Sequence, residues 1–103
     1  MSTSTTQPFP LETILRRLRE HRDELFARYP LRAMAVFGSV SRGDSRPDSD
    51  VDIMVEFERP VGLDFVRLSY DLEELLGVKV DLVSRKSIKD RYFKYIEPDL
   101  KYV

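Results

Sequence analysis

Two short apolar runs with a polar stretch between them constrain this chain more than any other feature. Ala33–Phe37 is apolar throughout, which is typical of a buried strand. Residues 50–58 alternate instead, with an apolar side chain at every second position from Val51 to Phe57. This period of two predicts a second strand. Residues 40–49 are polar and rich in turn formers, so they predict an exposed loop between the two strands.

Helical periodicity flanks the two strands. Apolar residues recur at helical spacing from Pro10 onward and Pro30 ends the pattern, so we expect one helix between them. Residues 63–76 predict a second helix, and Gly77 follows as its expected C-cap. Residues 78–83 alternate again and predict a third strand. The predicted order so far is therefore helix, strand, loop, strand, helix and strand.

The two ends of the chain complete the predicted architecture. Residues 1–9 are small and polar and predict a disordered tail, which leaves residues 10–103 as a single domain. Near the other end, Ser87 is expected to cap a short helix that runs to about residue 96, followed by an apolar tail at residues 100–103. The order of elements predicts an α/β fold of the α+β type, with a small mixed sheet and helices packed mainly on one face.

Composition narrows the class of protein. A chain of 103 residues with 42% hydrophobic residues has enough apolar side chains for one small core. Its net charge of −1 offers no general attraction for nucleic acid, so we expect no direct nucleic-acid binding. Cysteine is absent, which excludes disulfides and thiolate metal sites. Without a secretory signal or an apolar run of the roughly 20 residues that span a bilayer, we expect a soluble cytoplasmic protein with no membrane contact.

Three aspartates at the predicted second and third strands are candidate functional residues. Asp50 and Asp52 are two positions apart at the second predicted strand, so both side chains point to one face. Asp81 interrupts the apolar third strand, where burial disfavours a carboxylate. If the two strands are neighbours, an open sheet face carries all three carboxylates, which can share divalent metal ions and support in-line attack on a phosphoryl group. Gly38-Ser39 ends the first strand in a small-residue turn, whose free N–H groups can receive phosphate oxygens.

These residues resemble the nucleotidyltransferase superfamily related to DNA polymerase β, whose signature is Gly-Ser, a spacer, Asp-x-Asp and a later strand aspartate. The closer similarity is to the minimal nucleotidyltransferases of prokaryotes, and it covers nearly the whole chain. Three segments carry it: residues 38–43, 49–53 and 80–83. The resemblance implies the nucleotidyltransferase fold and an antitoxin of a type VII-like toxin–antitoxin pair. Such an antitoxin moves AMP from ATP to a tyrosine of a HEPN-domain ribonuclease toxin, which blocks RNA cleavage.

The resemblance also assigns roles to single residues. Three carboxylates are expected to form the catalytic site and to hold Mg²⁺, two ions in all: Asp50, Asp52 and Asp81. Asp81 is further expected to help deprotonate the acceptor hydroxyl. Three residues are expected to bind the triphosphate of ATP: Gly38, Ser39 and Arg42. The choice of ATP over other nucleotides rests on the resemblance alone.

Other interpretations of the same residues stay open. A non-catalytic antitoxin that neutralises its toxin by binding and masking it fits the same small domain. Nucleotidyl transfer to a small molecule or an RNA end is a third hypothesis, although the chain is too short for a second domain to hold such an acceptor. Near the C-terminus, packing against the sheet and contact with a partner are both consistent with a group of aromatic residues: Tyr92, Phe93, Tyr95 and Tyr102.

Overall fold

The computed structural model of the protein describes residues 10–44, 46 and 49–103, so the predicted tail at residues 1–9 lies outside the described residues. The helices are α1 Leu11–Glu20, α2 Arg22–Arg28, α3 Gly38–Arg42, α4 Asp64–Leu76 and α5 Asp90–Ile96. The strands are β1 Leu31–Phe37, β2 Val51–Phe57, β3 Val80–Ser84 and β4 Lys101–Tyr102. Two short 3-10 helices, Arg85–Ser87 and Glu97–Asp99, flank α5. Among the helices in these ranges, none combines the length and the apolar character that crossing a membrane requires.

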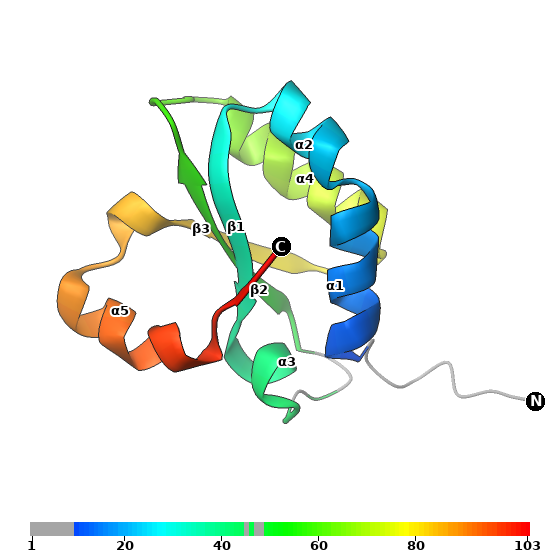
Figure 1. Cartoon of the computed structure of the whole chain (residues 1–103), viewed down its shortest axis with the longest axis vertical. Coiled ribbons are helices and arrows are strands. Elements are labelled where there is room, and N and C mark those ends of the chain that lie inside the picture. The colour runs from blue at the N-terminus through cyan, green and yellow to red at the C-terminus, as the bar shows by residue number, and fades with distance from the viewer. Residues whose placement is uncertain (1–9, 45, 47–48) are drawn as a thin grey trace, which may run out of the picture.

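The strands of the described residues form one mixed sheet in the order β3-β2-β1-β4. β1 lies antiparallel to both β2 and β4, whereas β2 and β3 are parallel. A parallel pair needs a crossover connection, and α4 provides it. Figure 1 shows α1, α2 and α4 on one side of the sheet and α5 on the other. The predicted small mixed sheet with helices mainly on one face is therefore confirmed.

The core lies between the sheet and the helices α1, α2 and α4. Helical positions on the sheet side are fully buried: Ile14 and Leu18 in α1, and Leu68, Leu72 and Leu76 in α4. They belong to one cluster with apolar side chains of the three longer strands: Val36, Ile53, Val55, Val80 and Leu82. Each large apolar side chain that leaves water contributes about 1.5–3 kcal/mol. This packing buries one face of the sheet.

The sheet face away from this core, which we expected to be open, is covered in part. Met54 and Ala35 lie on it and are 1% and 0% exposed. The C-terminal segment accounts for the cover, because β4 pairs with β1 and the 3-10 helix Glu97–Asp99 contacts both β1 and α3. This face is therefore divided into a covered part and an acidic part around Asp52.

The first helix is broken where a continuous one was predicted. His21 has φ −109° and ψ 9°, which ends α1, and α2 begins at the next residue. Leu25 of the second piece and Tyr29, which directly follows it, are nonetheless 5% and 4% exposed and belong to the same core cluster as Leu18. Since the apolar period continues through the break, periodicity alone does not locate it.

The segment after β1 is helical where a turn and an exposed loop were predicted. Gly38 begins α3, which continues to Arg42. Val40 is 4% exposed and belongs to the core cluster. The expectation that residues 40–49 contribute nothing to the core is therefore wrong at Val40, because one apolar residue in a polar stretch gives no periodic signal.

The C-terminal segment also differs from the prediction. α5 begins only at Asp90, so Ser87 does not cap it. The Ser87 hydroxyl instead donates a hydrogen bond to the backbone oxygen of Ser84, 2.8 Å away, within a separate 3-10 turn. The apolar tail expected at residues 100–103 contributes β4, whose Tyr102 pairs with Ala35 of β1. This short strand extends the sheet by one edge.

Candidate active site

The sheet register brings two of the predicted carboxylates side by side. β2 and β3 run parallel, and Asp52 is the direct partner of Asp81 across them. Neighbouring strands lie about 4.8 Å apart, and paired residues point to the same face. Asp50 lies one residue before β2 begins. The prediction that the second and third strands are neighbours is confirmed, and their register pairs Asp52 with Asp81.

Burial distinguishes the three aspartates. Asp50 and Asp81 are exposed, whereas Asp52 is half-buried. The expectation that Asp81 suffers from burial is wrong, because the sheet face is open at this point of β3. Burial, followed by the negative charges of Asp81 and Asp50, raises the pKa of Asp52 from 3.8 to about 6. The positive charge of Arg42 acts in the opposite direction and lowers this pKa.

The chemistry of this acidic cluster suits a hard divalent cation. Carboxylate oxygens are the side-chain ligands that Mg²⁺ prefers, and a cation relieves the repulsion that raises the Asp52 pKa. Within the part of the chain that the structure describes, no three histidine, aspartate or glutamate side chains form a group that could hold a metal ion by itself. Proteins commonly hold Mg²⁺ by one or two carboxylates together with substrate phosphates. Neighbouring carboxylates that do not enclose a metal ion by themselves fit this mode of binding.

Gly38 faces the half-buried carboxylate at close range. Phe37, the last residue of β1, is the register partner of Asp52, so the next residue lies beside the same carboxylate. A Cβ at position 38 would stand 2.1 Å from Asp52 Oδ2 and 3.3 Å from Asp52 Cβ. Gly38 also has φ +76°, a left-handed conformation that favours glycine. The sequence pattern predicted a phosphate-binding role for Gly38, but it did not reveal that this glycine makes room for Asp52.

Arg42 is held by two acidic residues that sequence reasoning missed. Its Nε donates to Asp44 Oδ2 at 3.3 Å, and its Nη1 donates to Asp99 Oδ2 at 3.0 Å. The neighbouring Ser41 hydroxyl donates to the backbone oxygen of Asp99. Asp99 is remote in sequence and carries no motif, so no local pattern marks it. The structure places it at the end of α3 because β4, which follows it, pairs with β1.

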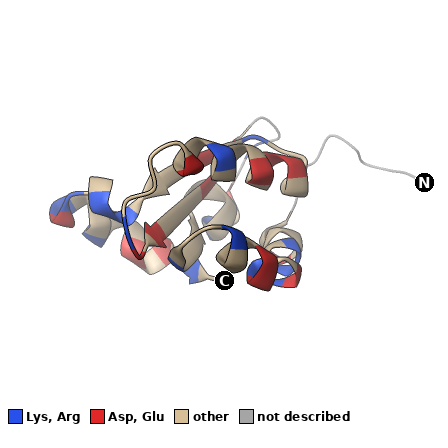
Figure 2. Cartoon of the chain, turned by 90° about the horizontal axis from the view of Figure 1, so that it is seen from above, with Lys and Arg blue, Asp and Glu red and all other residues tan. Residues whose placement is uncertain are grey.

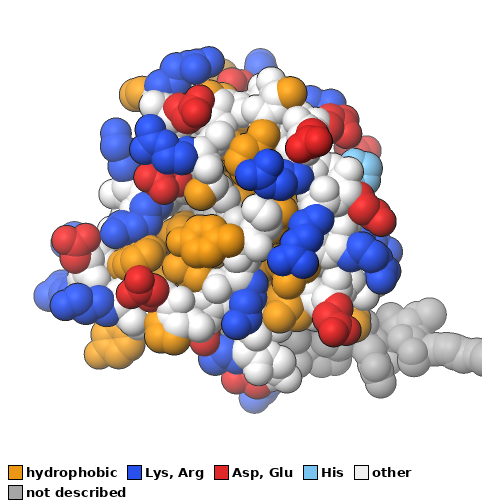
Figure 3. Space-filling model, in the orientation of Figure 1, with side chains coloured by type: hydrophobic (Ala, Val, Ile, Leu, Met, Phe, Trp, Pro, Cys, Tyr) orange, Lys and Arg blue, Asp and Glu red, His pale blue; other side chains and the backbone are white. Residues whose placement is uncertain are grey.

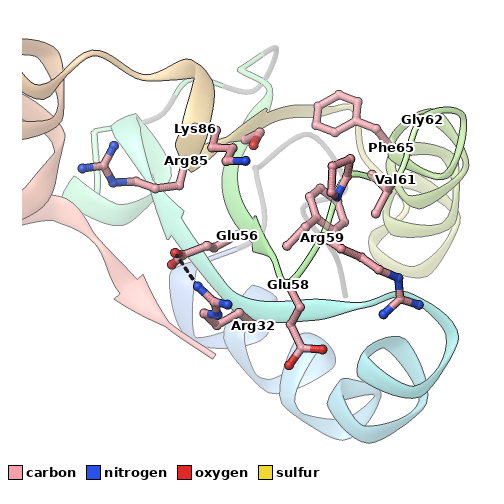
Figure 4. A pocket seen from close by; sticks show the side chains of 12 residues that line it. Arg32, Glu56, Glu58, Arg59, Val61, Gly62, Phe65, Arg85 and Lys86 are labelled. Atoms are coloured by element: carbon pink, nitrogen blue, oxygen red, sulfur yellow. Dashed lines mark ion pairs between the residues drawn. The ribbon is translucent and has the colours of Figure 1, made fainter.

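A cavity lies at the other end of β2. It has a volume of about 490 Å³, and its wall includes charged and aromatic side chains: Arg32, Glu56, Phe57, Phe65, Arg85 and Lys86. Figure 4 shows side chains that line it, with Arg32, Glu56 and Phe65 among those labelled, and the Arg32–Glu56 ion pair measures 3.5 Å. Asp50, Asp52 and Asp81 are not among its lining residues. The acidic cluster and this cavity are therefore separate features of the sheet.

The C-terminal helix turns aromatic side chains toward solvent. Tyr92 and Tyr95 of α5 are 54% and 80% exposed, and no residue of α5 is buried. Phe93 instead lies under the Arg85 guanidinium, with the guanidinium carbon 3.9 Å from the ring centroid. Figure 3 shows hydrophobic side chains around α5 with Lys and Arg among them, and Figure 2 shows charges of both signs on this helix. Phe93 therefore packs against a neighbouring side chain, whereas Tyr92 and Tyr95 form an exposed surface.

Comparisons with known proteins identify the family. Residues 16–102 match the family described as nucleotidyltransferase domain. The protein adenylyltransferase MntA of Thermococcus cleftensis is 45% identical over 94 residues, which cover 90% of this chain and 95% of the relative. A solved structure with the provisional description of a minimal nucleotidyltransferase is 42% identical, with a TM-score of 0.75 over 90% of this chain and 95% of that one.

A more distant solved structure shares the fold. It contains a tri-AMPylated HEPN toxin of Shewanella oneidensis in complex with an MNT antitoxin, and it matches at 23% identity with a TM-score of 0.55. The match covers 88% of this chain and 66% of that chain. The family match and the close relatives, which each span most of the chain, carry the assignment. The chain therefore belongs to the nucleotidyltransferase domain family, within the group of protein adenylyltransferases that includes MntA.

Proposed function

We propose that this chain is a Mg²⁺-dependent antitoxin that transfers AMP from ATP to a tyrosine of a HEPN-domain ribonuclease toxin and thereby inactivates it. The observation that carries the proposal is the pairing of Asp52 with Asp81, beside a glycine that leaves room for the Asp52 carboxylate. The Thermococcus relative, a protein adenylyltransferase, supports transfer to a protein. The Shewanella complex, in which a HEPN toxin carries AMP, supports this class of partner.

The proposed reaction is a displacement at phosphorus. The phenolic oxygen of the acceptor attacks the α-phosphorus of ATP, the bond to the bridging oxygen of the β-phosphate breaks, and pyrophosphate leaves. Asp81 is proposed to accept the phenolic proton, since its exposed carboxylate is accessible to a partner's side chain. Asp50 and Asp52 complete the set that would hold Mg²⁺, which when bound neutralises charge on the phosphates. Gly38 and Ser39 are proposed to contact the triphosphate.

The open position of the acidic cluster supports a large acceptor. Asp81 lies on an exposed sheet face, and the 490 Å³ cavity belongs to the opposite end of β2. A small-molecule acceptor is typically enclosed by a pocket that buries most of its surface. A protein acceptor instead brings its own surface and covers the face when it docks. This difference favours a protein over a small molecule.

Intact mass spectrometry of the cognate toxin tests the proposal. The toxin is incubated with the chain, ATP and Mg²⁺, and we expect discrete AMP-sized increments on a tyrosine. Asp52→Asn should abolish them, because it removes the half-buried carboxylate of the cluster. Glu56→Gln is the matched control: Glu56 lies on the same strand but pairs with Arg32 at the far end, so transfer should persist.

A masking antitoxin is the second candidate, and the exposed tyrosines of α5 favour it. Tyr92 and Tyr95 offer a contact surface that needs no catalysis. Under this alternative, Asp52→Asn leaves toxin neutralisation intact in cells, and no mass increment forms. A stable complex on size exclusion without any increment would contradict the transferase proposal and support masking.

A further inference from the structure

We propose that Asp99 is a positioning residue that holds Arg42 in place for the triphosphate, which makes the C-terminal segment part of the nucleotide site. The identity of the nucleotide rests on the function proposed above. Asp99 lies far from the family motif in sequence. Three hydrogen bonds at the end of α3 hold Arg42 and Ser41, and strand pairing brings Asp99 to them.

Two consecutive residues of α3 bind the same distant residue. Ser41 donates to the backbone oxygen of Asp99, and Arg42 Nη1 donates to its carboxylate at 3.0 Å. Asp44 adds a second acceptor for the same guanidinium, at Nε and 3.3 Å. A guanidinium has five N–H donors in a fixed plane, and these two contacts use two of them. Because two edges of the plane are held, the direction of the remaining donors is set.

The fold explains why Asp99 reaches this position. β1 ends at Phe37 and passes directly into α3. β4 runs antiparallel beside β1, with Tyr102 opposite Ala35. The chain entering β4 therefore approaches the sheet at the end where β1 leaves it, and the 3-10 turn ending in Asp99 meets α3 there. The contact follows from strand pairing rather than from a flexible tail that happens to touch α3.

The exposure of the pair argues against a purely stabilising role. The side chains of Arg42 and Asp99 are 48% and 23% exposed. Ion pairs at such positions contribute about 0–1 kcal/mol to stability, because water screens them and fixing long side chains costs entropy. Such ion pairs have a larger effect on the orientation of the side chain, because an arginine without a partner samples many rotamers. Arg42 lies in the same short helix as Gly38, whose backbone stands against the Asp52 carboxylate, so the held guanidinium lies near the acidic cluster.

A double-mutant cycle on nucleotide affinity tests the inference. Titration calorimetry with a non-hydrolysable ATP analogue and MgCl₂ measures the wild type, Asp99→Asn, Arg42→Ala and the double variant. We expect Asp99→Asn to weaken binding about 10-fold, the size of one charge-assisted hydrogen bond. In the Arg42→Ala background, the same change should have an effect of less than about 2-fold. Such non-additivity separates positioning of Arg42 from a general structural effect.

Two further variants sharpen the test. Asp99→Glu keeps the charge and should recover part of the affinity. Asp90→Asn removes the other acidic partner in the same segment, which pairs with Arg85 at 3.6 Å, and should leave affinity within about 2-fold. In the transfer reaction, Asp99→Asn should raise KM for ATP more than it lowers kcat at saturating ATP.

The outcomes are distinct. Unchanged affinity in Asp99→Asn, or additive effects of the two substitutions, overturns the positioning role. A wild-type chain that binds the analogue but transfers no AMP to the toxin contradicts the proposed function only. The affinity cycle still decides the role of Asp99 in that case, because it does not depend on turnover.

Discussion

The backbone of Gly38 lies against the Asp52 carboxylate, so position 38 has no room for a side chain. Gly38→Ala should therefore displace that carboxylate, and we expect transfer to fall about 100-fold or more, the usual effect of a misplaced reacting group. The left-handed backbone adds a stability cost of about 1 kcal/mol. Initial rates of AMP transfer and a thermal scan measure the two effects separately.

Gly77→Ala is the control for this prediction. Gly77 has φ +71°, but a Cβ there meets nothing within 4 Å. The variant should lose similar stability, about 4–8 °C in Tm, and keep its transfer rate. If both variants retain activity equally, the close approach of Gly38 to Asp52 has no catalytic importance.

The raised pKa of Asp52 gives a second prediction, on stability. The pKa is about 6 in the folded chain and 3.8 in the reference state, so the folded state disfavours the ionised form. The contribution of Asp52 to the free energy of unfolding is therefore full below pH 3.8, and it is lost as the pH rises through 6. Asp52→Asn removes this penalty and should raise the free energy of unfolding by about 1–2 kcal/mol at pH 7 in EDTA, a discounted value for a half-buried group.

Urea denaturation at two pH values measures this effect. Near pH 3.5 the wild type and Asp52→Asn should be almost equally stable, because the aspartate is then mostly protonated in both states. Added Mg²⁺ at pH 7 should stabilise the wild type more than the variant. A gain that is the same at both pH values would mean that repulsion within the acidic cluster is not its cause.

The position of a single residue was predictable where its spacing in the sequence determines the strand face on which it lies. The alternation of β2 and β3 placed Asp52 and Asp81 on one face, and the register confirms that they are direct partners. The roles of these residues and of Ser39 in binding metal and nucleotide stay predictions. The Arg42–Asp99 contact was not predictable, because it joins residues that only strand pairing brings together.

At the scale of elements, α5 carries a prediction about binding. We expect Tyr92→Ala with Tyr95→Ala to weaken binding to the proposed toxin partner at least about 10-fold, because exposed tyrosines are frequent anchors of protein interfaces. The thermal midpoint should hardly change, since neither side chain is buried. Calorimetric titration of the toxin gives the affinity. Tyr70→Ala, at a 66% exposed tyrosine of α4, is the control and should bind normally.

Helices and strands with a long apolar periodicity were predicted more accurately than short ones. β2 and α4 have long patterns and were predicted nearly as they stand. The break at His21 was missed because the apolar period runs through it. β4 was missed because two residues hold no period, and its pairing with β1 depends on the whole fold.

At the scale of the whole molecule, stability depends on the single layer between sheet and helices. Leu72 of α4 is 0% exposed, and Leu72→Ala should cost about 2–5 kcal/mol, because it removes buried methyl groups and leaves a cavity. Urea denaturation gives the loss. Leu63→Ala is the matched control: Leu63 is 74% exposed, and the change should stay within about 0.5 kcal/mol. Equal losses would mean that the core does not lie where the structure places it.

The arrangement of the sheet also provides a means of observing the enzyme. β2 begins beside the acidic cluster and ends at the 490 Å³ cavity, so the two are separated by roughly 17 Å of strand. Because the chain has no cysteine, one thiol introduced by Lys86→Cys at the cavity would be a unique attachment point for a fluorophore. A dye placed there stands clear of the carboxylates, so its signal can follow docking of a toxin in real time without blocking the chemistry.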